Sequence, residues 1–66
     1  MGTRTTTRGR ITRYERGVYA EDSATAAALV EAEVERDGLE LLPRRTEVAW
    51  TGRRGLYRVV AVGRAR

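Results

Sequence analysis

The clearest hydrophobic pattern in the chain predicts a helix over residues 22–37. Half of this segment is Ala, Leu or Val, and Ala27, Val30 and Val34 lie at i, i+3 and i+7, which places them in one buried stripe. Acidic residues stand at its start, and Gly38 follows it as a C-terminal stop. Because alanines form much of the helix, we expect it to approach a sheet closely.

A β-hairpin is predicted over residues 46–62, where two segments with period-2 alternation flank the turn Gly52-Arg53-Arg54-Gly55. The glycines at both ends of the turn suit a tight reversal. The expected register consists of three cross-strand pairs: Thr51 with Leu56, Trp50 with Tyr57, and Val48 with Val59.

The other face of this hairpin carries Leu56, Val60 and Val62, which is too apolar for a fully wet surface. We expect these side chains to meet another strand layer, a second copy of the chain or a partner protein.

Residues 10–20 hold Ile, Val and two Tyr among Arg, Thr and Glu, a composition that favours at least one strand. Gly17 interrupts the segment and indicates a bulge or a turn between two short strands. The chain is therefore predicted to be α+β: an antiparallel β-α-β-β sheet, or β-β-α-β-β if Gly17 is a turn, with one helix packed on one face. We expect a flexible basic arm over 1–8, a single domain over 9–63 and a basic tail over 64–66.

The length of 66 residues allows one small domain, with 17 apolar side chains left once the nine alanines and Met1 are set aside from the 27. That number serves one layer of helix–sheet contacts and leaves little to enclose a ligand, so no small-molecule substrate is expected.

The chain contains neither Cys nor His, which removes thiolate nucleophiles, imidazole bases and the usual zinc ligands. The one serine, Ser23, stands where a helix N-cap is expected, and capping explains it better than nucleophilic attack. We therefore expect no enzyme activity, no cofactor and no metal. Because no apolar stretch approaches 18 residues and no secretory signal is present, we expect a cytoplasmic protein away from membranes.

Charge divides the chain into three blocks. The net charge is +4 over residues 1–20, −6 over residues 21–40 and +6 over residues 41–66. All 13 basic residues are Arg. A genome of high GC content would explain the missing Lys, and the preference of the planar guanidinium for phosphate and base edges is the functional alternative.

Arg53 and Arg54, at the tip of the predicted hairpin, are the sharpest candidate site. Two guanidinium groups on a projecting turn suit phosphate contacts, and β-ribbons enter nucleic-acid grooves, although a solubilising turn has the same composition. Other arginines would extend this site into a basic sheet face if the fold gathers them. They are Arg44, Arg45, Arg58, Arg8, Arg10 and Arg13.

Aromatic side chains also suit stacking on unpaired bases. For Trp50 and Tyr57 we expect a place in the core, because a chain without Phe needs their area against the helix. Tyr14 and Tyr19 are the better candidates for exposure.

Two segments resemble parts of known families. Residues 24–63, with the Ala-rich helix and the closing strand, resemble one half of a SPOR domain, a peptidoglycan-binding repeat. Residues 10–20, by the placement of Gly9, Ile11 and Tyr14, resemble the arm-binding domains of phage integrases. Neither resemblance assigns a role to a residue of this chain.

The hypothesis that best fits these patterns is a small nucleic-acid-binding or accessory protein, of bacterial or phage type, that contacts DNA or RNA phosphates through Arg on the hairpin and the N-terminal arm. The alternative is a dimeric protein-interaction module that uses the apolar second face of the sheet. In such a dimer, the acidic helix of one copy would also suit the Arg-rich sheet of another.

Overall fold

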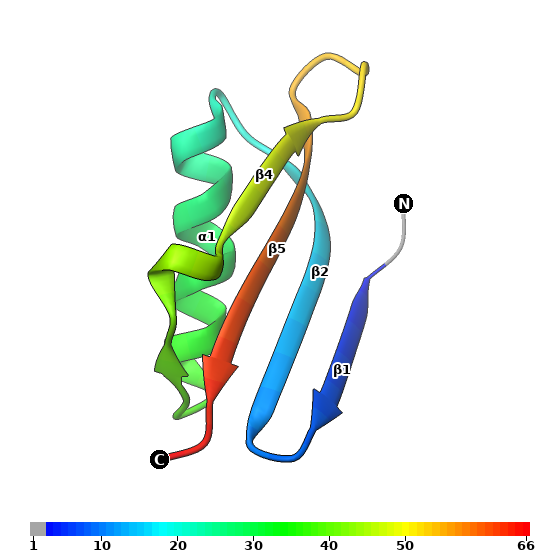
Figure 1. The fold of residues 1–66 in the computed structure, drawn as a ribbon. Helices are drawn as coiled ribbons and strands as arrows, with labels where there is room; N and C mark the ends of the chain where they lie inside the picture. The colour runs from blue at the N-terminus through cyan, green and yellow to red at the C-terminus, as the bar shows by residue number, and fades with distance from the viewer. Residues whose placement is uncertain (1–2) are drawn as a thin grey trace.

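The computed structural model describes residues 3–66 and has the predicted α+β architecture (Figure 1). One helix packs on one face of an antiparallel sheet of five strands. The elements in chain order are β1 (Arg4–Arg8), β2 (Ile11–Tyr19), α1 (Ser23–Arg36), β3 (Glu40–Leu41), the 3-10 helix η1 (Pro43–Arg45), β4 (Glu47–Trp50) and β5 (Leu56–Arg64).

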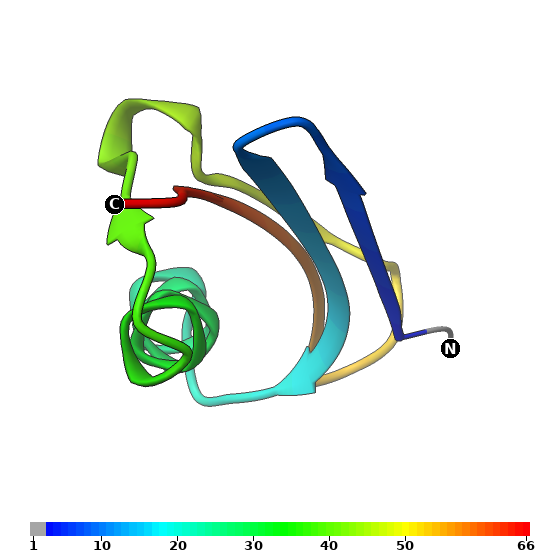
Figure 2. The same cartoon turned by 90° about the horizontal axis from the view of Figure 1, so that it is seen from below.

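Strand β5 is the centre of the sheet. It pairs with β2 along one side, and with β4 and then β3 along the other, while β1 pairs with the free side of β2. The β-β-α-β-β alternative is thus the one that fits, with β3 and η1 added between the helix and the last hairpin. The sheet curves around α1, which lies on its concave side (Figure 2).

The last hairpin has the predicted register. Trp50 lies opposite Tyr57 and Val48 opposite Val59, and Thr51 donates its backbone N–H to the carbonyl of Leu56. The turn is short and bounded by glycines, and a short turn allows the two strands only a few registers.

The first hairpin differs from the prediction, because its turn is at Gly9 and Arg10 and not at Gly17. Arg8 pairs with Ile11, and Gly9 has a φ of 62°, a conformation that glycine adopts without strain. Gly17 instead continues β2 and pairs with Arg58.

The expected flexible arm is therefore wrong for residues 4–8, which form β1. Its first two residues, Met1 and Gly2, lie outside the described part of the chain. Strand β1 has no apolar side chain to bury, and polar contacts hold it instead: Arg16 donates from Nη1 to the carbonyl of Arg4 and from Nη2 to Oγ1 of Thr5, both at 2.8 Å. The hydroxyls of Thr7 and Thr12 lie 3.0 Å apart.

The expected tail over 64–66 is also tied to the fold. Arg64 belongs to β5 and pairs with Ile11, and Ala65 donates its N–H to the carbonyl of Arg10 at 2.7 Å. The end of β5 therefore closes onto the turn of the first hairpin.

The N-cap of helix α1 lies one residue earlier than expected. Asp22, not Ser23, is the N-cap: its side chain accepts the N–H of Thr25 at 2.8 Å. This hydrogen bond lowers the pKa of the Asp22 carboxyl. The helix ends as predicted before Gly38, whose φ is 83°.

The core lies between α1 and the inner face of the sheet, the face directed at the helix. Its buried stripe on α1 consists of Ala26, Val30 and Val34, with the expected Ala27 only at its edge. The sheet supplies Tyr14, Val59 and Ala61 to this core. Small residues on β5 permit the close approach: a Cβ added at Gly63 would lie 2.6 Å from Val34 Cγ1.

The outer face of the sheet, directed away from α1, does not expose the apolar residues expected there. Leu56, Val60 and Val62 are 2%, 8% and 3% exposed within the single chain. By register, Val60 lies between Glu15 of β2 and Glu47 of β4, and long polar side chains cover apolar neighbours with their aliphatic stems. The dimer hypothesis was based on exposure of these three apolar side chains, and they are not exposed.

No helix among residues 3–66 combines the length and the apolar character needed to cross a membrane.

Candidate nucleic-acid interface

The loop that carries Arg53 and Arg54 has a defined backbone. Gly52 and Gly55 have φ values of 90° and 74°, which reverse the chain within four residues. Thr51 holds the loop from one side, since its hydroxyl accepts the N–H of Arg53 at 3.2 Å and donates to the carbonyl of Leu56 at 2.9 Å. The loop projects beyond the sheet at one end of the molecule (Figure 1).

Trp50 braces the same loop. Its Nε1 donates to the carbonyl of Arg53 at 2.8 Å, while 64% of the residue stays exposed. The expected core position of Trp50 is therefore wrong. The reason is that β4 is an edge strand, and its end that leads into the loop runs away from α1 (Figures 1 and 2).

Of the two tyrosines that were expected to be exposed, one is exposed and the other is buried. Tyr19 is 71% exposed, as expected. Tyr14 is buried at 3%, because its inner-face position lies under α1, and its hydroxyl donates to Oδ2 of Asp37 at 2.6 Å. Burial and this hydrogen bond to Asp37 raise the pKa of Tyr14 to about 12.

The outer face of the sheet gathers arginines from three parts of the chain, because alternate residues of β1, β2 and β5 point away from α1. These outer-face arginines are Arg4, Arg8, Arg13, Arg58 and Arg64. Three of them were candidates from the sequence, whereas Arg4 and Arg64 were missed. Extending the alternation of β2 across the turn at Gly9 would have found Arg4, and continuing that of β5 two residues beyond Val62 would have found Arg64.

Glu15 neutralises part of this outer face. Its carboxylate accepts from Nη2 of Arg58 at 2.7 Å and also pairs with Nη1 of Arg13. The hydrogen bond from Arg58, supported by that from Arg13, lowers the pKa of Glu15. Two guanidinium groups share one carboxylate, so this cluster keeps one positive charge.

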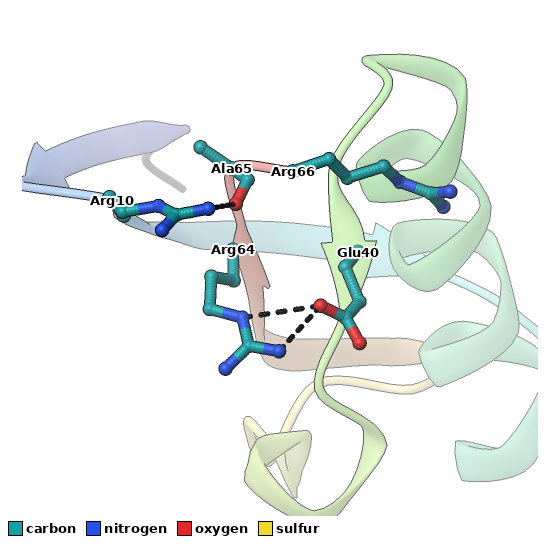
Figure 3. A pocket seen from close by; sticks show the side chains of 5 residues that line it. All are labelled: Arg10, Glu40, Arg64, Ala65 and Arg66. Atoms are coloured by element: carbon teal, nitrogen blue, oxygen red, sulfur yellow. Dashed lines mark hydrogen bonds and ion pairs between the residues drawn. The ribbon is translucent and has the colours of Figure 1, made fainter.

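A second group of arginines lies where β5 ends against the first turn (Figure 3). Arg10 donates to the carbonyl of Ala65 at 2.8 Å, and Arg64 binds Glu40 with contacts of 2.7 and 3.2 Å. The bond to Arg64 lowers the pKa of Glu40. Figure 3 shows the side chain of Arg66 directed away from Arg10 and Arg64, so the three cations do not converge on one point.

The fold thus brings some of the eight candidate arginines together and leaves others apart. Arg53 and Arg54 share the loop, Arg13 and Arg58 share Glu15, and Arg8 and Arg10 lie at the first turn, at the other end of the sheet. Arg44 and Arg45 lie separately on η1. Six of the eight make no ion pair with a carboxylate of residues 3–66; the exceptions are Arg13 and Arg58.

The helix side has the opposite charge. Glu31, Glu33 and Glu35 lie on α1, against the single basic residue Arg36 in that helix. Arg16, the one arginine of the inner face on β2, is bound to Glu33 by two hydrogen bonds of 2.8 and 3.0 Å, with 12% of its side chain exposed. It is a structural link between sheet and helix.

The comparisons with known proteins place no constraint on function: no family model, no curated protein and no solved structure matches the chain. Neither of the two resemblances seen in the sequence is supported by them. Among residues 3–66, no group of three or more acidic, Cys or His side chains is arranged to hold a metal ion.

Proposed function

We propose that this protein binds nucleic acid through phosphate contacts made by Arg53 and Arg54 of the hairpin loop and by the outer-face arginines. The observation that carries the proposal is the pair of guanidinium groups on a braced, exposed loop with no carboxylate partner among residues 3–66. Such a pair keeps its full charge and hydrogen-bonding capacity for a polyanion.

The division of charge supports an oriented complex. Arg4 and Arg8 on the outer face also make no ion pair with a described carboxylate, and Arg13 and Arg58 exceed the charge of Glu15 between them. The glutamates of α1 lie on the opposite side of the sheet. A polyanion is therefore attracted to the loop and the outer face and repelled from the helix.

The function proposed here is binding or accessory to another activity, in the cytoplasm, and it requires no catalytic group, metal or cofactor. Arg44 and Arg45 on η1 are assigned no part in the main interface, because the fold does not join them to the loop.

Salt titration with labelled DNA tests the proposal. The affinity should fall steeply between low and moderate salt, because each phosphate neutralised by Arg releases a counterion. Arg53→Ala combined with Arg54→Ala should weaken binding and reduce the salt slope by about one for each phosphate contact removed.

A matched control separates local contacts from net charge. Arg36→Ala also removes one exposed cation without an ion pair, but from the acidic helix side, so it should weaken binding much less than Arg53→Ala alone. Equal losses for the two single variants, or no binding by the wild type at low salt, would refute the proposed interface.

A further inference from the structure

Trp50 is the least expected feature of the loop end of the molecule. It is the only Trp of the chain, and in a protein of 66 residues without Phe its area would be valuable in the core. Instead it is 64% exposed, close to the two arginines with no carboxylate partner. An exposed aromatic side chain of this size is a candidate for contact with a ligand.

The ring is held in place. The hydrogen bond from Nε1 to the carbonyl of Arg53 fixes the edge of the indole against the loop, and Trp50 also pairs with Tyr57 across the hairpin. A hydrogen bond along the ring edge leaves the face of the ring available for a flat partner. The ring therefore loses little conformational freedom when a partner stacks on it.

The same hydrogen bond places the ring beside the residues that carry the charges. Because the backbone carbonyl of Arg53 is the acceptor, the indole lies against the loop backbone from which the side chains of Arg53 and Arg54 start. An aromatic face next to guanidinium groups matches a nucleotide, whose base offers a π face and whose phosphate lies within a few ångströms of that base.

We infer that the nucleic acid bound at the loop is single-stranded, with one base stacked on Trp50 and the adjoining phosphates held by Arg53 and Arg54. This inference rests on the proposed function and specifies its substrate class. Duplex DNA fits the loop less well, since its bases are stacked on one another and their faces are closed to the indole except at the ends.

Tyr19 is the other large aromatic that is exposed near this end, and it has a different setting. It belongs to the outer face, opposite the face of Trp50, and no hydrogen bond of its side chain ties it to the loop. It therefore serves as the matched comparison for an exposed ring without the bracing contact.

Intrinsic fluorescence is a direct test, because all Trp emission of the protein comes from Trp50. We expect an oligo(dT) strand to quench this emission on binding, and inorganic polyphosphate, a polyanion without bases, to leave it nearly unchanged. The strand should also bind more tightly than a duplex of equal length at the same salt concentration. Equal affinity for strand and duplex, with no change in emission, would overturn the inference.

Two substitutions isolate the face of the ring. Trp50→Phe and Trp50→Leu both lose the Nε1 donor, and only Phe keeps a π face. Measured by the anisotropy of a labelled oligo(dT) strand, we expect Trp50→Leu to lose about tenfold in affinity and Trp50→Phe to stay within about threefold of the wild type. Tyr19→Leu should cost clearly less affinity than Trp50→Leu, because the ring of Tyr19 lacks the contact that holds Trp50 against the loop. Equal losses for Phe and Leu, or a loss for Tyr19→Leu as large as that for Trp50→Leu, would remove the assigned role of the ring.

The failure of this inference is distinguishable from failure of the proposed function. Salt-dependent binding that needs Arg53 and Arg54 but neither quenches Trp50 nor prefers single strands contradicts the inference alone. Absence of binding to strand, duplex and polyphosphate at low salt contradicts both. Circular dichroism of each variant should match the wild type, because the side chain replaced is exposed in every case.

Discussion

Tyr14 shows how one side chain joins the sheet to the helix. It is buried among core residues of α1 and β5, and its hydroxyl donates to Asp37, the C-cap of α1. Arg16, two residues further along β2, lies over its ring at 5.1 Å from the centroid and binds Glu33 of the helix. These two residues anchor the same edge of α1 through polar contacts that the small apolar core alone does not provide.

Tyr14 should make the stability of the protein depend on alkaline pH. Burial and the bond to Asp37 raise its pKa from 10.0 to about 12, so the folded state holds the phenol proton more tightly than the unfolded state. The stability that this difference supplies is present below pH 10 and is lost as the pH rises from 10 to 12.

Denaturant unfolding at several pH values measures this effect. Wild type and Tyr19→Phe should lose stability in parallel between pH 10 and 12, whereas Tyr14→Phe should lose less over that interval. At pH 7, Tyr14→Phe should cost about 1 kcal/mol for the lost hydrogen bond. A Tyr14→Phe profile that runs parallel to the wild type would show that Tyr14 does not titrate as described.

At the scale of elements, α1 is bounded by a polar cap at its start and a glycine at its end. Asp22 satisfies the N–H of Thr25, which has no partner within the helix. Ser23 lies next to it, inside the first turn, and no hydrogen bond of its side chain is formed with residues 3–66.

Substitution of Asp22 and of Ser23 should therefore have different effects on the stability of the protein. We expect Asp22→Ala to lower the free energy of unfolding at pH 7 by about 1 kcal/mol, and Ser23→Ala to change it by less than about half of that. Because the bond to Thr25 lowers the pKa of Asp22, the advantage of Asp22 should disappear as the pH falls through that pKa and the carboxyl is protonated. A larger cost for Ser23→Ala would contradict the assignment of the cap.

Elements were predictable from the sequence where a strong local pattern coincided with a turn or stop signal. The helix and the last hairpin had both, and the register of Trp50 with Tyr57 was confirmed. The first hairpin lacked an apolar pattern in β1, so Gly17 was a better turn candidate than Gly9. Strand β1 is held by its backbone pairing with β2 and by polar contacts of Arg16 and Thr12, which an apolar pattern does not encode.

At the scale of the whole molecule, the fold turns three charge blocks of the sequence into two sides. The acidic block becomes α1 with its caps, and the two basic blocks become a sheet whose outer face and loop carry most of the arginines. The blocks were visible in the sequence. Which arginines stay without a carboxylate partner was not, because the pairing of Arg58 with Glu15 joins residues that are 43 positions apart.

The exposure of Trp50 was likewise beyond the sequence. Its position in the hairpin was predicted correctly, and its burial was not, because the path of the edge strand β4 relative to α1 decides whether the ring is covered. The opposite error concerns three apolar residues of β5, which were expected to need a further layer or a partner. The single chain buries all three: Leu56, Val60 and Val62.

We propose that nucleic acid contacts the loop and the outer face and avoids the helix. Backbone and Trp indole NMR resonances of the protein, followed during titration with oligo(dT) at low salt, test this residue by residue. We expect the largest shifts at Trp50, Arg53 and Arg54, smaller ones at outer-face arginines such as Arg4, Arg8 and Arg58, and almost none along residues 23–36. Shifts concentrated on the helix, or none at any residue, would contradict it.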